Sequence, residues 1–404
     1  VFEIASQRRL DEYHKLEIPS EAEKVFRVNE AIENDLMKMQ PNGPNRKGTY
    51  RHEDFQWNDV SQEEAERLVI NGQSLLVLGI AGTGKSTFVK KLVESLKQLK
   101  KQVDIISKTH CASERINGVT ADHYARRHIL NGSCNADTIW IDEISQLEHD
   151  LWCHLNKLKE RQWLLSGDFN QFAPIWNSYR GCDIKANAFE NSRFLYILSG
   201  GNRLTLTECR RSEQDLFDFY SSLIQGGKRW NIPLREVIEE ARQMFCFEGY
   251  ARHNLVISHN KRIKINKELN NYYKTKEAVF LKIKPQKGQL CKAQSMWIWQ
   301  GLELLGSTQS SKKGIRNNVM YVVEQINDDN IIMKKRGSEE TICLSKEQVG
   351  SYLRLSYAQT YASVQGTEFS ESLRLHDTTN SHFTKKHLFV AISRGKKKDL
   401  MDVT

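Results

Sequence analysis

A glycine-rich stretch with one lysine and one serine carries the clearest chemical signal in the sequence. Residues 79–86, GIAGTGKS, fit the phosphate-binding pattern G-x-x-x-x-G-K-[ST] at every fixed position. An apolar run precedes the stretch, and apolar residues at helical spacing follow it. In a strand–loop–helix of this kind, backbone N–H groups face phosphate oxygens, Lys85 reaches the β- and γ-phosphates, and Ser86 binds Mg²⁺. The stretch therefore predicts an ATP–Mg²⁺ site whose candidate contacts are Gly79, Ala81, Gly82, Thr83, Gly84, Lys85, Ser86 and Thr87.

Two carboxylates follow another apolar run, residues 138–141, in the arrangement of a Walker B motif. Asp142 is expected to hold Mg²⁺, and Glu143 to act as general base toward the attacking water. An acidic helix start is a compatible second interpretation, since carboxylates favour helix N-termini. After the next predicted strand, Gln171 is placed to sense the γ-phosphate.

Polar and aromatic residues also follow two of the predicted strands. Loops at the carboxyl edge of a parallel sheet face the ligand crevice. Polar groups after the predicted strand at residues 103–107 could therefore hold a nucleic-acid backbone. Phe172 and Pro174, beside Gln171, could meet a base and so couple nucleotide state to the grip on a strand.

These motifs resemble a known enzyme family. GIAGTGKS, IDEISQ and GDFNQFAP, in this order, resemble motifs I, II and III of superfamily 1 helicases, and the IDEIS form is similar to the Pif-type and RecD-like branch. The resemblance implies that the segment THCA…INGVTADH contacts single-stranded DNA, with Thr109, His110 and His123 as candidates. It also implies that Gln62 reads the adenine, whereas ordinary packing is an equal alternative for this region.

The second half of the chain continues the resemblance. LTECRRS resembles motif IV, which implies that Arg211, or alternatively Arg210, contacts the γ-phosphate. Residues 388–394, read as a buried strand, resemble motif VI and deliver Arg394 as an arginine finger; a surface arginine is the alternative. LVISHN is similar to another family segment, and residues 355–368 resemble motif V without its usual histidine. The implied strand contacts there are Asn260, Thr360, Ser363 and Gln365, and the implied nucleotide contact is Gly366.

The length and composition agree with several domains. The 404 residues carry a net charge of +9, which favours a polyanionic partner. No apolar run reaches the roughly 20 residues of a membrane span, and the eight scattered cysteines form no C-x-x-C pair, so neither a membrane nor structural zinc is expected. The cysteines are interpreted as reduced thiols of an intracellular protein of unspecified compartment. The first residue is Val, not Met, which leaves open whether the chain is a piece of a longer polypeptide.

The expected fold class is α/β, with two RecA-like motor domains built on parallel sheets and a small β-barrel insert. A helical extension and linker is expected at residues 1–54, the first motor domain at 55–195, the second at 196–275 and 351–404, and the insert at 276–350.

The resemblance implies an ATP-dependent DNA helicase that moves 5′→3′ on single-stranded or forked DNA, as a monomer. Two alternatives stay open at this point. One is an RNA helicase similar to those of positive-strand RNA virus replicases. The other is a nucleic-acid-stimulated ATPase that does not unwind.

Overall fold

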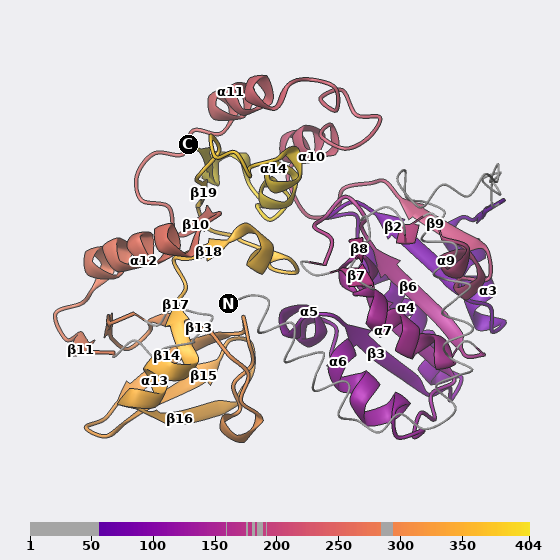
Figure 1. Ribbon diagram of the computed structural model, residues 1–404, viewed down its shortest axis with the longest axis horizontal. Helices are drawn as coiled ribbons and strands as arrows, with labels where there is room; N and C mark the ends of the chain where they lie inside the picture. The colour runs from indigo at the N-terminus through magenta and orange to yellow at the C-terminus, as the bar shows by residue number, and fades with distance from the viewer. Residues whose placement is uncertain are drawn as a thin grey trace.

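The computed structural model describes residues 56–158, 160–174, 177–179, 182–183, 189–190, 192–283 and 294–404 (Figure 1). The expected extension at residues 1–54 lies outside this part of the chain. Three groups of elements are visible: a first sheet with its helices, a second sheet with its helices, and an antiparallel sheet beside the second (Figure 1).

The first sheet is parallel at every pairing and has, within the described residues, seven strands. Their order is β1 (Asn58–Asp59), β9 (Asn202–Leu206), β2 (Leu75–Gly79), β6 (Gln162–Gly167), β5 (Thr138–Asp142), β3 (Val103–Ser107) and β4 (Val119–Thr120). The central strands are apolar runs because both faces of a parallel sheet are covered. Since β2, β5 and β6 run in one direction, their carboxyl ends share one edge.

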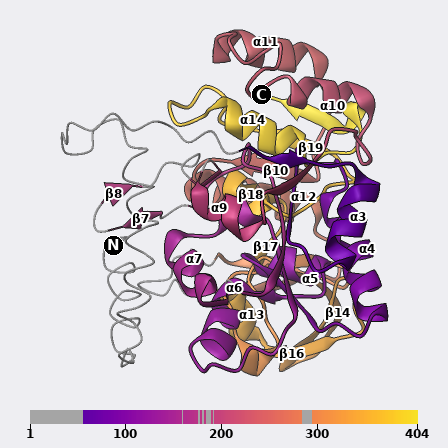
Figure 2. The same cartoon turned by 90° about the vertical axis from the view of Figure 1, so that its right-hand side faces the viewer.

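Two apolar cores cover the two faces of the first sheet. Phe88 and Val69 belong to one core, and Trp152 and Leu195 to the other. The helices on these faces are α3 (Gln62–Ile70), α4 (Lys85–Gln98), α5 (His110–Arg115), α6 (Ala121–Tyr124), α7 (His149–Leu155) and α9 (Arg193–Leu198), with a π-helical turn (Ala125–Ile129) and 3₁₀ turns (Ile144–Gln146, Asn156–Leu158). A small hairpin pairs β7 (Ser178–Tyr179) with β8 (Cys182–Asp183). In Figure 2, α3 and α4 lie to the right and α7 and α9 to the left.

The second sheet is also parallel. Its described strands are β18 (Ala358–Thr360), β10 (His253–Val256), β19 (Leu373–Leu375) and β20 (Met401–Val403), in that order. Its core contains Leu255, Phe389 and Val390. The surrounding elements are α10 (Gln214–Ser221), α11 (Leu234–Met244), α12 (His259–Tyr273), α14 (Lys385–Ile392) and 3₁₀ turns (Tyr361–Val364, Lys398–Leu400).

The antiparallel sheet occupies the range in which the sequence indicates β-rich structure. Its described strands are β16 (Thr341–Ser345), β15 (Asn330–Lys335), β14 (Met320–Ile326), β13 (Glu303–Gly306) and β17 (Leu353–Leu355), in that order. Helix α13 (Lys346–Tyr352) connects β16 to β17, a 3₁₀ turn (Ser311–Lys313) precedes β14, and β11 (Val279–Leu281) pairs separately with β12 (Met296–Ile298).

The structure corrects three sequence-based expectations. The run at residues 388–394, expected as a strand, is largely helix α14, because a short apolar run does not distinguish a buried strand from a helix buried on all sides. Asn260, expected in a loop after a strand, lies in the first turn of α12. Strand β9 joins the first sheet, so this sheet continues past residue 195, where the sequence placed the end of its domain.

Candidate nucleotide site

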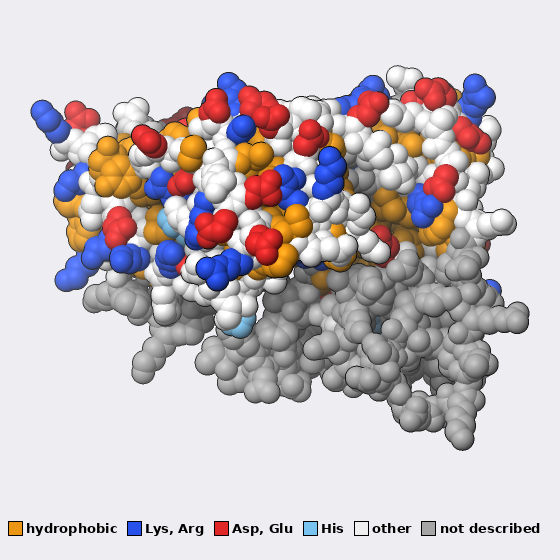
Figure 3. Space-filling model, turned by 90° about the horizontal axis from the view of Figure 1, so that it is seen from above, with side chains coloured by type: hydrophobic (Ala, Val, Ile, Leu, Met, Phe, Trp, Pro, Cys, Tyr) orange, Lys and Arg blue, Asp and Glu red, His pale blue; other side chains and the backbone are white. Residues whose placement is uncertain are grey.

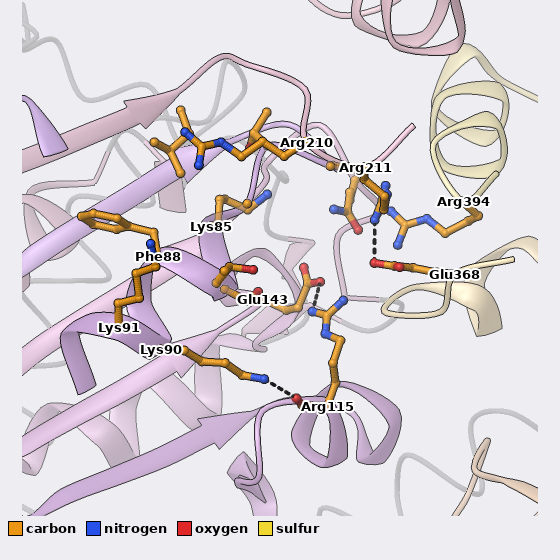
Figure 4. A pocket seen from close by; sticks show the side chains of 18 of the residues that line it. Lys85, Phe88, Lys90, Lys91, Arg115, Glu143, Arg210, Arg211, Glu368 and Arg394 are labelled. Atoms are coloured by element: carbon orange, nitrogen blue, oxygen red, sulfur yellow. Dashed lines mark hydrogen bonds and ion pairs between the residues drawn. The ribbon is translucent and has the colours of Figure 1, made fainter. Parts of the chain in front are cut away.

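A cavity lies at the carboxyl edge of the first sheet (Figure 4). Its volume of about 430 Å³ is within the size range of small-molecule sites. Its wall combines the phosphate loop and the start of α4 with charged side chains from later in the chain. The lining residues are Gln62, Ala81, Gly82, Thr83, Gly84, Lys85, Ser86, Thr87, Phe88, Lys90, Lys91, Arg115, Glu143, Gln171, Leu206, Arg210, Arg211, Glu368 and Arg394.

The phosphate loop has the backbone that its glycines permit. Gly82 and Gly84 both have φ of 88°, a left-handed conformation that side-chain-bearing residues rarely adopt. The Nζ atom of Lys85 donates to the carbonyl oxygens of Gly79, at 2.7 Å, and Ile80, at 3.1 Å. Burial lowers the pKa of Lys85, and Asp168, Glu143 and Asp142 act in the opposite direction. The ammonium group is thus held inside the loop, where a phosphate would meet it.

Ser86, in the first turn of α4, lies beside Asp142, the last residue of β5. The Ser86 hydroxyl donates to Asp142 Oδ2 at 2.9 Å, and the Ser166 hydroxyl donates to Asp142 Oδ1 at 2.7 Å. Asp142 is 1% exposed, and its carboxylate is fixed at both oxygens. A hydroxyl and a carboxylate oxygen side by side are the hard oxygen ligands that Mg²⁺ prefers, so this pair fits the ion that the sequence predicts.

Glu143 stands in a strained conformation next to this pair. Its φ of 58° and ψ of 46° lie in the left-handed region, which costs a residue other than glycine about 1–3 kcal/mol. Its Oε2 atom is buried and has no hydrogen-bond partner among the described residues. Burial, and next the charge of Asp142, raise the pKa of the Glu143 carboxyl group. A strained, buried acid with one free oxygen suits a base that accepts a proton from a bound molecule.

Gln171 approaches the cavity from the loop after β6. It is 3% exposed, and its Nε2 atom donates to Asp168 Oδ2 at 3.2 Å. Its Oε1 atom, like the free oxygen of Glu143, is buried without a partner among the described residues. Buried polar atoms are normally paired, so two unpaired acceptors at one cavity indicate a ligand site.

Three arginines line the opposite wall. Arg210 is 57% exposed at its side chain, and its backbone N–H donates to Gly82 O. Arg211 is 14% exposed and pairs with Glu368 at 3.0 Å, and it also donates to the carbonyl oxygen of Ser393. Arg394 is 1% exposed, donates to Val390 O at 3.1 Å, and turns toward the cavity (Figure 4). Burial, with Arg211 next, lowers the pKa of Arg394 to about 10.

Sequence reasoning missed two residues of the cavity, Arg115 and Glu368. Arg115 ends α5 and reaches Asp142 and Glu143. Burial lowers the pKa of Arg115, but the negative charges around it, those of Asp142, Glu143 and Glu368 among them, together raise it above its ordinary value. Glu368, at the C-terminal end of the motif V segment, holds Arg211. The available signal was the charge of the two residues, which lie within or between the stretches already identified as family motifs.

Two predicted nucleotide contacts lie outside the lining. Gly79 lies behind the loop, where its carbonyl oxygen holds Lys85. Gly366 has φ of 77°, and a Cβ atom there would lie 3.4 Å from the Cβ of Ala112, so this glycine permits a close approach to α5. Trp57, just before β1, packs against Tyr196 and Arg203.

Three of the predicted contacts with single-stranded DNA lie at the start of α5 or on α6. The Thr109 hydroxyl caps α5 by accepting the Ala112 N–H at 3.2 Å. His110 Nε2 lies 2.7 Å from Gln309 Oε1 of the antiparallel-sheet region. His123 is exposed on α6.

The remaining predicted contacts with single-stranded DNA lie between the two parallel sheets or around the second sheet. The ring of Phe172 meets His387 edge-on at 4.8 Å, and its carbonyl oxygen accepts the Gln365 amide at 3.2 Å. The Ser363 hydroxyl donates to Thr360 O at 2.8 Å, beyond the carboxyl end of β18. The other two, Pro174 and Asn260, are half-buried and exposed, respectively. The structure thus brings Phe172 and Gln365 together, but it does not gather the nine residues into one cavity.

Comparisons with known proteins agree with this geometry. Residues 58–184 match the model of a family described as AAA domain. The Pif1 ATP-dependent DNA helicase of Candida albicans is 26% identical over 227 residues, which cover 46% of this chain and 25% of that protein. The human Pif1 helicase is 29% identical over 146 residues, covering 29% of this chain and 22% of that protein. The chain is similar to Pif1 helicases over these residues. The predicted resemblance to the Pif-type branch of superfamily 1 helicases is confirmed.

Solved structures of Pif1 helicases have a similar fold over most of the chain. A structure of two Pif1 helicases at forked double-stranded DNA has a TM-score of 0.63 and 18% identity, and covers 85% of this chain and 90% of that one. The Candida albicans Pif1 helicase has a TM-score of 0.60 and 19% identity, covering 85% and 94%. Both matches show the fold, an α/β architecture with parallel sheets. The chain spans about a quarter of the length of the curated Pif1 relatives it matches. None of the described helices is long and apolar enough to cross a bilayer.

Proposed function

We propose that this chain is the motor of an ATP-dependent DNA helicase that translocates on single-stranded DNA, 5′→3′, and couples ATP hydrolysis to unwinding. The observation that carries the proposal is one cavity that joins the phosphate loop, Glu143 and arginines from beyond the first sheet, with Asp142 hydrogen-bonded to Ser86 of the lining. The architecture is then two motor units, on the first and second sheets, with the antiparallel sheet as the insert. Because β9 joins the first sheet and β17 the antiparallel one, the unit boundaries fall after residues 206 and 355.

In this proposal, each group at the cavity takes a part in phosphoryl transfer. Ser86 and Asp142 would hold Mg²⁺, which neutralises charge on the β- and γ-phosphates when bound. Lys85 binds the same phosphates, and Glu143 accepts the proton of the attacking water through its free oxygen. The amide of Gln171 orients that water or the γ-phosphate. Arg394 and Arg211 stabilise the charge that develops on the transferred group.

Single-stranded DNA is proposed to run past α5 and Phe172 rather than over the face that Figure 3 shows. Lys and Arg side chains alternate with Asp and Glu on the face seen from above (Figure 3). The net charge of +9 is therefore not concentrated on that face. The Pif1 relatives include a Bacteroides enzyme solved with ADP-AlF3 and single-stranded DNA, which supports a strand-bound motor.

Strand displacement on matched DNA and RNA forks tests the proposal. Forks with a 5′ or a 3′ single-stranded tail are mixed with the chain and ATP–Mg²⁺, and release of a labelled strand is followed. We expect release from the 5′-tailed DNA fork and none from the 3′-tailed one. The matched control is Glu143→Gln, which keeps the shape of the site and removes the base, so it should bind the fork without releasing the strand.

The other outcomes identify the alternatives. Release from RNA forks alone would indicate an RNA helicase. Strand-stimulated ATP hydrolysis without release from any fork would indicate a remodelling ATPase. Unchanged hydrolysis in Glu143→Gln would place the general base elsewhere.

A further inference from the structure

Helix α5 touches three parts of the molecule although it has only six residues. Its first residue, His110, lies 2.7 Å from Gln309, between β13 and β14 of the antiparallel sheet. Its Cys111 thiol lies 3.8 Å from Gly366 O and 3.7 Å from Thr367 Oγ1, on the second-sheet side. Its last residue faces the nucleotide cavity. The helix is therefore placed to communicate between these parts.

The contact with the antiparallel sheet is ionic and partly buried. Glu114 pairs with Lys335, the last residue of β15, at 2.5 Å, and it also pairs with Arg316. The side chains of Lys335 and Glu114 are 11% and 21% exposed. Salt screens partly buried pairs less than exposed ones, so this junction should persist at physiological ionic strength.

The next residue contacts the acids of the nucleotide cavity. Arg115 Nη2 lies 3.3 Å from Asp142 Oδ2 and 3.5 Å from Glu143 Oε1 (Figure 4). The Arg115 carbonyl oxygen accepts the Nζ atom of Lys90 at 2.7 Å, which attaches the end of α5 to α4. One guanidinium thus contacts both carboxylates and leaves the second oxygen of Glu143 without a partner.

We propose that Arg115 is a positioning residue for Asp142 and Glu143, and that docking of the antiparallel sheet on Glu114 sets its position. This inference rests on the proposed function and adds a coupling route to it. Glu114 and Arg115 are consecutive residues of the same short helix, about 1.5 Å apart along its axis, so a shift of α5 at Glu114 carries Arg115 with it. At 3.3–3.5 Å, a displacement of that order separates Arg115 from both carboxylates. Nucleotide and strand then influence each other through α5.

Linkage makes this coupling measurable without turnover. If nucleotide changes strand affinity by some factor, the strand changes nucleotide affinity by the same factor. The measurement is the dissociation constant of a labelled single-stranded oligonucleotide, with and without a saturating non-hydrolysable ATP analogue. In the wild-type chain we expect a ratio of about 5–150, the usual range of such couplings. In Glu114→Gln and Arg115→Gln the ratio should fall to near one, while the analogue still binds.

Two further variants separate coupling from folding. Glu339→Gln removes an exposed ion pair with Lys334 on the same sheet, away from α5, and should keep the wild-type ratio. Charge reversal of both partners, Glu114→Lys with Lys335→Glu, should restore part of the ratio that Glu114→Lys alone loses. Strand-stimulated ATP hydrolysis should follow the same order across the series.

The outcomes distinguish this inference from the proposed function. A wild-type chain that binds neither strand nor analogue overturns the proposed function itself. Binding of both with a wild-type ratio of one, or with a ratio unchanged in Glu114→Gln and Arg115→Gln, overturns the α5 inference alone.

Discussion

The two walls of the nucleotide cavity are built differently. On the first-sheet wall, Lys85, Asp142 and Gln171 lie at loop and strand ends that share one edge, and buried hydrogen bonds hold them. On the opposite wall, Arg211 and Arg394 are occupied by the protein's own groups, Glu368 and the carbonyl oxygen of Val390. The first wall is therefore preorganised for phosphate, whereas the arginines must exchange partners to reach it. Loss of the phosphate-binding Lys85 on the first wall should affect binding as well as turnover, whereas loss of an arginine on the second wall should affect mainly the chemical step.

The largest effect is expected for Lys85→Ala on the first wall. The substitution removes the cation that the phosphate loop holds 2.7 Å from Gly79 O, and nothing else in the loop carries a formal positive charge. We expect ATP hydrolysis to be abolished and analogue affinity to fall, measured by steady-state turnover and equilibrium binding. Unchanged turnover would remove the phosphate loop from the mechanism.

Arg394→Ala should have the next largest effect and should separate the two walls. Arginine fingers contribute about 10³–10⁵ in turnover. Because Lys85, Ser86 and Asp142 remain, we expect strand-stimulated turnover to fall by that order while analogue affinity changes much less. Arg394→Lys should rescue poorly, since a point charge does not reproduce the planar fork of guanidinium.

The same measurements include the results that would contradict the role of Arg394. If affinity falls in step with turnover, Arg394 is a ground-state contact or a structural residue. If neither affinity nor turnover changes, Arg394 has no part in the second wall's effect on the chemical step.

The first wall was more predictable from sequence than the second for a physical reason. A phosphate loop and a Walker B pair are local patterns, and the sheet edge brings them together once the strands are recognised. Arg115 and Glu368 act through tertiary contacts that no local pattern contains. Helix α14 was predicted as a strand because its apolar run is buried on all sides. The spacing of apolar residues therefore did not distinguish a helix from a strand. The assignment of β9 to the first sheet likewise depends on strand pairing over long range.

The two halves should also differ in their response to acid, an effect of moderate size. Burial lowers the pKa values of His253, His376 and His387, around the second sheet, to about 4, from an ordinary 6.5. These histidines stay neutral in the folded state, whereas the unfolded chain binds protons below pH 6.5. Their contribution to stability is therefore complete above pH 6.5 and is lost as pH falls toward 4. On the first-sheet side, burial lowers the pKa of His154 in the same direction.

Hydrogen exchange at pH 7 and pH 5 can resolve this difference between the halves. Protection of the second-sheet strands should fall more than that of the first-sheet strands. His376→Gln should reduce the pH dependence, because it removes one of the groups that the unfolded chain protonates. An equal loss of protection in both sheets would contradict a special acid sensitivity of the second half.

The smallest effect is expected for Tyr220→Phe, which tests how far the first wall depends on the second half. The Tyr220 hydroxyl, on α10, donates to the carbonyl oxygen of Ala81 in the phosphate loop at 2.9 Å. Burial raises the pKa of this phenol to about 12, so the hydroxyl remains a donor at neutral pH. Removing it leaves a buried carbonyl without that bond, a loss of about 1 kcal/mol. If this whole loss of free energy destabilises the nucleotide-bound state, the affinity for the analogue drops about fivefold.

A matched tyrosine distinguishes the loop contact from a general loss of stability. Tyr124 is also fully buried, and its hydroxyl donates to Asp104 at 2.8 Å on the first-sheet side, with no part in the cavity wall. Tyr124→Phe and Tyr220→Phe should lower the thermal midpoint by similar amounts, but only Tyr220→Phe should weaken analogue binding. Equal affinities in the two variants would mean that the first wall holds its shape without α10. The preorganisation of that wall would then come from the first sheet alone, and the contrast between the two walls would be sharper than the hydrogen bond to Ala81 suggests.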